Sequence, residues 1–98
     1  DLMKCVFLEP HIGVDFQSVI RSLDSRQIRV ELEPHNLEWN VPLETLNDDR
    51  YFFDQERLYL SGRRQGNLIR IGQRLKLKLI RVDVLQRNID FDFEGWLN

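Results

Sequence analysis

The chain has 98 residues, of which 42% are hydrophobic and 31% are charged, and its formal net charge is −2 at pH 7. This length fits one domain with one modest core, and no apolar run approaches the roughly 18–20 residues that a membrane-spanning helix needs. A single cysteine excludes an internal disulfide framework and is typical of a reducing compartment such as the cytoplasm.

The first segment, residues 1–13, has no strand pattern. Its apolar residues are spaced for one helical turn, which Pro10 and Gly13 would end. The chain begins with Asp1 rather than Met, so we expect it to be a piece of a longer protein. We therefore interpret residues 1–13 as a linker and the tail of a preceding domain, and residues 14–98 as the domain itself.

Three strands are predicted next, over residues 15–24, 27–33 and 37–43. Apolar and polar side chains alternate there with a period of two, which is typical of strands with one buried and one wet face. The alternation is cleanest in the second segment, where Ile, Val and Leu face one way and charged residues face the other. A turn at residues 34–36 joins the second strand to the third.

The middle of the chain is less regular. Residues 44–50 are polar and could hold a short helical turn. Residues 51–60 contain two short extended pieces around a turn at Asp54 and Gln55, and residues 61–67 form a basic loop that contains two glycines.

The clearest strands are the last two, predicted at residues 74–84 and 87–94. In the first of them leucines alternate with Lys76 and Lys78, so one face is buried and the other presents cations. Short strands at regular spacing without a long helix predict an all-β barrel. A small barrel with a basic outer surface is a common way to hold a nucleic-acid backbone.

The cations are concentrated in one segment of the chain. Residues 55–87 carry nine cations and two acids, whereas the remaining residues carry five cations and fourteen acids. A molecule with this asymmetry can bind an anionic polymer despite its negative net charge. The alternative is an ordinary solvated surface, because residues that are close in sequence need not share one face.

The second half of the chain resembles a known family in the order and spacing of its motifs. It is similar to the carboxy-terminal S1-type RNA-binding domain of ribonuclease II/ribonuclease R family exoribonucleases. Six motifs carry the resemblance: Tyr51–Asp54, Gly62–Gly66, Ile71–Gln73, Leu75–Ile80, Arg81–Asp83 and Asn88–Phe91.

The resemblance implies an all-β, five-stranded OB-fold (S1-like) barrel with short turns and at most a one-turn helix. It implies a domain that holds single-stranded RNA and guides it toward the separate catalytic domain of a 3′→5′ exoribonuclease during RNA degradation. That catalytic domain would use magnesium, whereas this fragment would carry no cofactor and would not itself be an enzyme. We expect the fragment to be monomeric, cytoplasmic and free of any membrane contact, with RNA and the catalytic domain of the same chain as its partners.

The first hairpin departs from the family pattern. The family has Ser-Phe-Gly-x-Phe-Val and, on the third strand, a histidine, whose rings stack on bases. This chain has Arg26 and Arg29 at the two phenylalanine positions and Pro42 at the histidine position, which resembles the ribonuclease II branch. Guanidinium planes can stack on bases and pair with phosphates, so we expect backbone-dominated, sequence-tolerant binding.

The candidate RNA-binding residues are cations at or near the family's binding positions, together with one acid of the last turn: Arg26, Arg29, Arg63, Arg64, Lys76, Lys78, Arg81, Asp83 and Arg87. For each cation the alternative is a solvated strand face, a mobile loop tip or a surface ion pair of little worth. Alternation also leaves one ring of the Tyr51–Phe53 stretch for the surface, either to stack on a base or to pack a satellite cluster.

No catalytic or metal-binding set is predicted. Asp48, Asp49 and Asp54 are expected to have structural roles in turns. His11 and His35 are far apart in sequence, and one cysteine cannot build a zinc site. The alternative function is a protein-interaction or spacer barrel that has lost RNA binding together with its aromatic residues.

Overall fold

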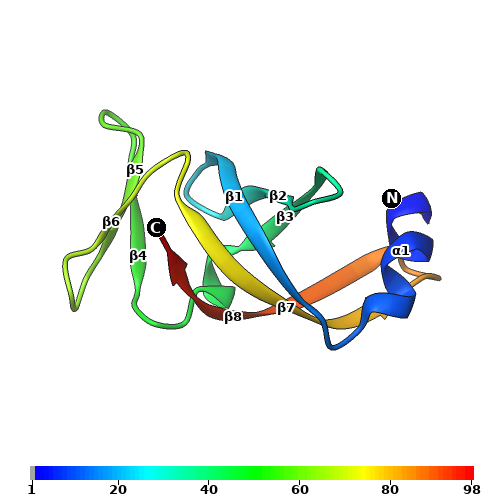
Figure 1. Ribbon diagram of the computed structural model, residues 1–98. Helices are drawn as coiled ribbons and strands as arrows, with labels where there is room; N and C mark the ends of the chain where they lie inside the picture. The colour runs from blue at the N-terminus through cyan, green and yellow to red at the C-terminus, as the bar shows by residue number, and fades with distance from the viewer. Residues whose placement is uncertain (1) are drawn as a thin grey trace.

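The chain folds into two antiparallel β-sheets preceded by one short helix (Figure 1). The computed structural model describes residues 2–98, so that Asp1 lies outside the described residues. The elements in chain order, with η1 and η2 as 3₁₀ turns, are α1 (Leu2–Leu8), η1 (Glu9–His11), β1 (Asp15–Leu23), β2 (Gln27–Leu32), β3 (Leu37–Pro42), η2 (Leu43–Thr45), β4 (Tyr51–Asp54), β5 (Tyr59–Gly62), β6 (Leu68–Ile69), β7 (Arg74–Asp83) and β8 (Asn88–Leu97).

Five strands form a curved sheet in the order β3-β2-β1-β7-β8, and β4, β5 and β6 form a separate small sheet. The small sheet lies at one end of the molecule and α1 at the other, beside the turn between β7 and β8 (Figure 1). The predicted strands at residues 15–24, 27–33 and 37–43 correspond to β1, β2 and β3. Those at residues 74–84 and 87–94 correspond to β7 and β8.

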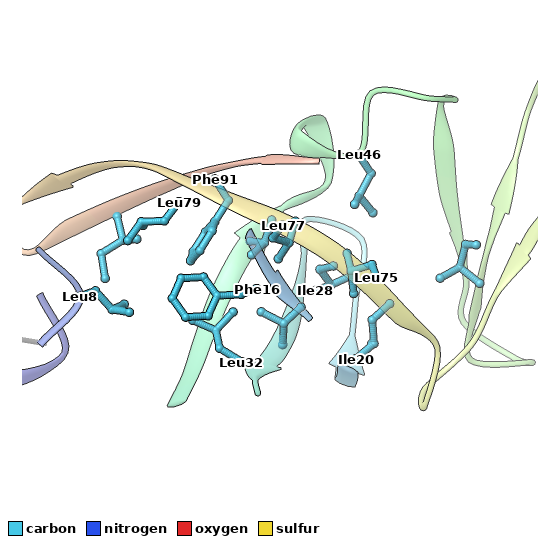
Figure 2. Close-up of a cluster of buried hydrophobic side chains, with 14 of the residues drawn as sticks. Leu8, Phe16, Ile20, Ile28, Leu32, Leu46, Leu75, Leu77, Leu79 and Phe91 are labelled. Atoms are coloured by element: carbon cyan, nitrogen blue, oxygen red, sulfur yellow. The ribbon is translucent and has the colours of Figure 1, made fainter. Parts of the chain in front are cut away.

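The inward-facing side chains of the alternating strands build one hydrophobic core (Figure 2). In β2 every second residue is buried, and the three leucines at alternate positions of β7 have no solvent exposure. Burying one such side chain contributes about 1.5–3 kcal/mol. The alternation of apolar and polar residues in the sequence therefore corresponds to the alternation of buried and exposed side chains in the structure. The exposed faces of these strands carry the charged residues.

The large sheet has the character of an OB-fold, but its hydrogen-bonded ladder does not close. Irregular pairing between Ile20 and Ser22 in β1, and at two places between β7 and β8, marks bulges that bend the strands. Among the described residues β3 and β8 remain the sheet edges. A small pocket of about 50 Å³, which Pro42 and Phe91 help to line, lies between these two strands. The predicted all-β, OB-type fold is confirmed, with an open seam in place of a closed barrel.

The amino-terminal segment packs onto the core of the domain. Cys5 and Leu8 of α1 are buried against it, and the helix is longer than the single turn expected. Pro10 lies in η1, where the helical segment ends. The assignment of residues 1–13 to the tail of a preceding domain stays a prediction. Among the described residues, no helix has the length and apolar character needed to cross a membrane.

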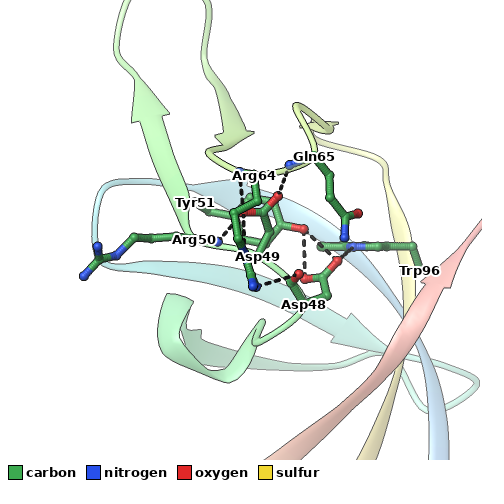
Figure 3. Close-up of polar contacts among 7 residues, drawn as sticks. All are labelled: Asp48, Asp49, Arg50, Tyr51, Arg64, Gln65 and Trp96. Atoms are coloured by element: carbon green, nitrogen blue, oxygen red, sulfur yellow. Dashed lines mark hydrogen bonds and ion pairs between the residues drawn. The ribbon is translucent and has the colours of Figure 1, made fainter.

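Asp48 joins the two sheets. Its carboxylate accepts hydrogen bonds from the Tyr51 hydroxyl of β4 at 2.9 Å and from the indole Nε1 of Trp96 in β8 at 2.8 Å (Figure 3). Burial, and then the hydrogen bond to Asp48, raise the pKa of the Tyr51 hydroxyl above its usual range. The rings of Tyr51 and Trp96 also meet edge to face at 6.1 Å. This carboxylate therefore has the structural role expected of it and holds the small sheet against the end of β8.

Candidate nucleic-acid surface

Arg29 lies on the outer face of β2, at the position where the family has a stacking aromatic. Its Nε donates to Glu38 Oε1 at 2.6 Å and its Nη1 donates to Asn40 Oδ1 at 3.2 Å, both on β3. A shallow hollow of about 300 Å³ opens here, and Asn88 at the start of β8 lines it as well. Lys4 reaches the same hollow from α1 and donates to the Glu38 carbonyl oxygen at 2.9 Å. The positive charge of Arg29 is thus offset by a neighbouring carboxylate.

Arg26 lies in the tight turn between β1 and β2. Asp24 Oδ1 accepts hydrogen bonds from the backbone N–H groups of Arg26 at 2.7 Å and Gln27 at 3.0 Å, and these bonds lower the pKa of the Asp24 carboxyl. The Arg26 carbonyl oxygen accepts a bond from the Leu43 N–H, which fastens this turn to η2. The Arg26 side chain is exposed, and within the described part of the chain no carboxylate lies within 4 Å of its guanidinium.

Most cations along β7 are engaged by acids. Lys78 Nζ lies 3.4 Å from Glu94 Oε1 on β8. Arg81 contacts both Asp90 at 3.2 Å and Asp83 at 3.4 Å. Lys76 has Gln17 and Gly95 as its register partners, and no ion pair forms at it within residues 2–98. Acids on β7 and β8 therefore neutralise much of the face of β7 that the sequence predicts to be basic. Lys76 is left on this face as a cation without an ion pair in the described residues.

The turn between β7 and β8 has two of the candidate residues at it, Asp83 at the end of β7 and Arg87 just before β8. Asp83 Oδ1 accepts the backbone N–H of Gln86 at 3.0 Å, and Oδ2 is the partner of Arg81. Arg87 has a positive φ of 56° and an exposed side chain. Asp83 and Arg87 form no ion pair with each other in the described residues, so Asp83 shapes the turn and Arg87 points its charge to solvent.

Arg63 and Arg64 lie at the opposite end of the molecule, in the loop between β5 and β6. The Arg63 guanidinium carbon lies 4.5 Å from the centroid of the Phe52 ring. Arg64 Nη2 donates to the Asp48 carbonyl oxygen at 3.2 Å, and its side chain is 70% exposed. Both arginines line an open groove of about 940 Å³ between η2 and the small sheet.

Asp49 shapes that groove from below. Its buried carboxylate accepts the backbone N–H groups of Arg50 at 2.6 Å and of Arg64 and Gln65 at 2.9 Å each (Figure 3). The bond from Arg64 is the main cause of the lowered pKa of this carboxyl. A Cβ on Gly62 would lie 2.5 Å from Asp49 Oδ2, so the loop can fold over this carboxylate only because residue 62 is glycine. The loop arginines are thereby fixed above the groove.

The nine predicted residues thus fall into three regions of the structure. Arg29 lies at the hollow on β2 and β3, the β7 residues and Arg87 follow one hairpin, and Arg63 and Arg64 lie at the groove, with Arg26 in the turn beside it. Sequence reasoning missed Glu38 as the partner of Arg29, although counting back from the turn at residues 34–36 would have placed both on one face.

Sequence reasoning also missed Arg50, and no signal in its acidic surroundings marks it as a groove residue. No group of three or more His, Cys, Asp or Glu side chains within residues 2–98 could hold a metal ion. The magnesium that the family resemblance implies for a separate catalytic domain stays a prediction.

Comparisons with known proteins show which proteins this chain is similar to. No protein-family model matches it. It is 32% identical over 92 residues to ribonuclease R 1 of Lactococcus lactis, and 33% identical to ribonuclease R of Thermotoga maritima over 90 residues and of Aquifex aeolicus over 92. These matches cover 92–94% of this chain but only 11–13% of the relatives' length.

Solved structures agree with the sequence relatives. The apo form of Mycoplasma genitalium RNase R superposes with a TM-score of 0.82 at 26% identity, over 95% of this chain and 14% of that one. The same enzyme in complex with ribose-methylated single-stranded RNA gives a TM-score of 0.81 over 94% of this chain and 14% of that one. The resemblance predicted from the motifs is confirmed: the chain is homologous to one domain-sized segment of ribonuclease R.

Proposed function

We propose that this chain is an RNA-binding domain that holds single-stranded RNA and guides it toward the catalytic domain of a 3′→5′ exoribonuclease of the ribonuclease II/ribonuclease R family. The observation that carries the proposal is the match of nearly the whole chain, in sequence and in fold, to ribonuclease R, including a structure of that enzyme with single-stranded RNA. The chain itself contributes positioning and charge, and the proposed hydrolysis takes place elsewhere in the parent protein.

The chemistry available to the domain suits RNA backbone more than base sequence. Arginine and lysine side chains bind phosphates, and binding releases counterions from the RNA. Arg29 presents a planar guanidinium at the hollow and can exchange Glu38 for a phosphate or stack on a base. Lys76 and Arg87 carry charges with no ion-pair partner in the described residues. We therefore propose sequence-tolerant binding, in which Arg26, Lys78 and Arg81 contribute further phosphate contacts.

Further properties of the parent protein follow from the same proposal. The domain would work beside a catalytic domain of the same chain that holds magnesium, in the cytoplasm and as a monomeric unit. In this arrangement RNA affinity comes from several weak contacts, and the tethered catalytic site gains from the raised local RNA concentration.

One observation favours the alternative, a protein-interaction or spacer barrel. Arg29, Arg74, Lys78 and Arg81 all lie within 4 Å of a carboxylate on the large sheet, so much of its positive charge is already neutralised. A barrel of this kind would show no RNA binding of its own and would contact other domains through its surface.

A titration with single-stranded RNA at low salt tests the proposal. We expect micromolar or weaker affinity that falls steeply with salt, with amide shifts at Arg26, Arg29 and Arg87. The double variant Arg26→Glu/Arg29→Glu should lose at least roughly tenfold in affinity, because two attractive contacts become repulsive. Arg57→Glu, a charge reversal in the β4–β5 turn, is the matched control and should change affinity much less. No RNA-dependent shift anywhere in the chain would favour the spacer barrel.

A further inference from the structure

A groove lies between η2 and the small sheet. Three separate segments build it: the β1–β2 turn at Ser25, the stretch from η2 to β4, and the loop after β5. At about 940 Å³ it is roughly three times as large as the hollow beside Arg29. Its lining combines apolar residues of η2 and β4 with three arginines: Arg50, Arg63 and Arg64. A groove that combines apolar residues with three arginines suits a ligand that is both aromatic and anionic.

Phe52 offers a ring face at this groove. Strand alternation buries Tyr51 and turns Phe52 outward, where it keeps 43% of its surface exposed. Arg63 lies over the Phe52 ring at 4.5 Å, and its backbone N–H is held by the Arg50 carbonyl oxygen at 2.9 Å. Exposed aromatic and guanidinium planes are the surfaces on which unpaired bases stack. Without a ligand, the contact between Arg63 and Phe52 would only cover an exposed ring. The groove around it is lined by two further arginines, Arg50 and Arg64, and this favours a ligand-binding role.

Two of the three groove arginines have no carboxylate partner in the described residues. Asp49, the nearest acid, uses its carboxylate on three backbone N–H groups and lies 3.8 Å from Arg64 Nε. Within the part of the chain that the structure describes, Arg50 and Arg63 form no ion pair, and Figure 3 shows Arg50 pointing away from the carboxylates. Glu44 is the other acid in the lining, and it is exposed. Phosphate groups can therefore reach Arg50 and Arg63 without displacing an ion-pair partner among the described residues, whereas Arg64 would exchange its contacts to Asp48 and Asp49.

We propose that this groove is a second RNA subsite, separate from the β2–β3 face, in which a nucleobase stacks on the Phe52–Arg63 pair while Arg50 and Arg64 bind adjacent phosphates. The subsite rests on the proposed RNA-binding function and deepens it, because it assigns stacking to residues outside the first hairpin. A single strand is required, since a base within a duplex cannot present its face to Phe52.

Two variants separate the parts of the subsite. Phe52→Leu keeps an apolar side chain but removes the ring, and it should weaken binding of a single-stranded RNA oligomer by roughly 5- to 100-fold with an unchanged salt slope. Arg50→Ala removes one phosphate contact and should lower the slope of log affinity against log salt by about 0.7. Leu58→Ala, at an exposed position of the β4–β5 turn, and Arg57→Ala are the matched controls and should change neither quantity. Thermal unfolding of each variant confirms that the fold is retained.

The outcomes distinguish this inference from the proposed function. If the chain binds RNA and Arg29→Glu weakens it, but Phe52→Leu and Arg50→Ala bind as the parent does, the subsite is wrong and the function stands. If the chain binds no RNA, both fail. A poly-glutamate peptide of equal charge that shifts the amides of residues 50–52 and 63–65 as strongly as RNA would overturn the assignment to RNA in favour of an acidic protein partner.

Discussion

The large sheet and the groove both carry cations but differ in what those cations can do. On the large sheet Arg29, Lys78 and Arg81 face acids on the neighbouring strand at 2.6–3.4 Å. At the groove the nearest carboxylate is turned inward to backbone N–H groups, and Arg50 and Arg63 form no ion pair in the described residues. The positive charge available to an anion is therefore set by strand register and turn hydrogen bonds more than by the number of basic residues.

The two regions also differ in how they are stabilised. The large sheet rests on its apolar core, and its surface ion pairs are worth at most about 1 kcal/mol each. The groove depends on one buried carboxylate and on a glycine that makes room for it. Changes at Asp49 or Gly62 should therefore affect folding and binding together, whereas changes at exposed side chains on the face of the sheet should affect mainly binding.

The largest stability effect is expected for Gly62→Ala. The added methyl group would lie 2.5 Å from Asp49 Oδ2 and 2.9 Å from its Cγ, and the carboxylate cannot move without losing its backbone hydrogen bonds. We expect a loss of about 1–3 kcal/mol in the free energy of unfolding, measured by chemical denaturation. Ser61→Ala, next in the strand, is the control. An unchanged denaturation midpoint for Gly62→Ala would show that the groove is not built on this contact.

Acid should loosen the groove before the sheet. The folded-state pKa of Asp49 is held below its usual 3.8 by backbone N–H donors, so its contribution to stability is present above 3.8 and is lost as the pH falls through the folded-state pKa. Asp49→Asn keeps one acceptor oxygen but cannot titrate, and it should flatten this part of the pH dependence of unfolding. Amide shifts of Arg64 and Gln65 followed during an acid titration report the same event. Shifts that track only the global unfolding would contradict it.

The smallest effect is expected on the large sheet, from Glu38→Gln. Removing this charge frees Arg29 and should raise RNA affinity a few-fold, with a salt slope steeper by about 0.7 if Arg29 takes up one more phosphate. The free energy of unfolding should change by no more than about 1 kcal/mol. Asp90→Asn is the matched control, because Arg81 keeps its second acid, Asp83. An unchanged affinity for Glu38→Gln would remove Arg29 from the RNA path.

Much of this fold could be predicted because burial imposes a period of two on the strands. The segments at residues 27–33 and 74–84 alternate so clearly that their inward faces follow from the sequence. β6 has two residues and leaves too short a pattern to detect. The packing of Cys5 and Leu8 onto the core was missed because one short helix gives a weak apolar period.

The candidate site was less predictable than the fold. The resemblance pointed to Arg26 and Arg29, but the acid that engages Arg29 lies across a hairpin and depends on register. The proximity of Arg63 to Phe52 depends on two strands of the small sheet whose pairing the sequence did not specify. Charge patterns along a sequence report which residues are basic, and only the folded neighbours decide which of them are free to bind.

The most direct test of the account is a map of amide shifts as single-stranded RNA is added to the chain at low salt. We predict the largest shifts at residues 50–52 and 63–65 and at the cations without a carboxylate partner in the described residues, Arg26, Lys76 and Arg87. Smaller shifts are expected at Arg29, Lys78 and Arg81, whose charges are already paired. Shifts confined to the paired cations Lys78 and Arg81, or no shifts at all, would contradict the claim that available charge, and not the number of basic residues, directs RNA to this domain.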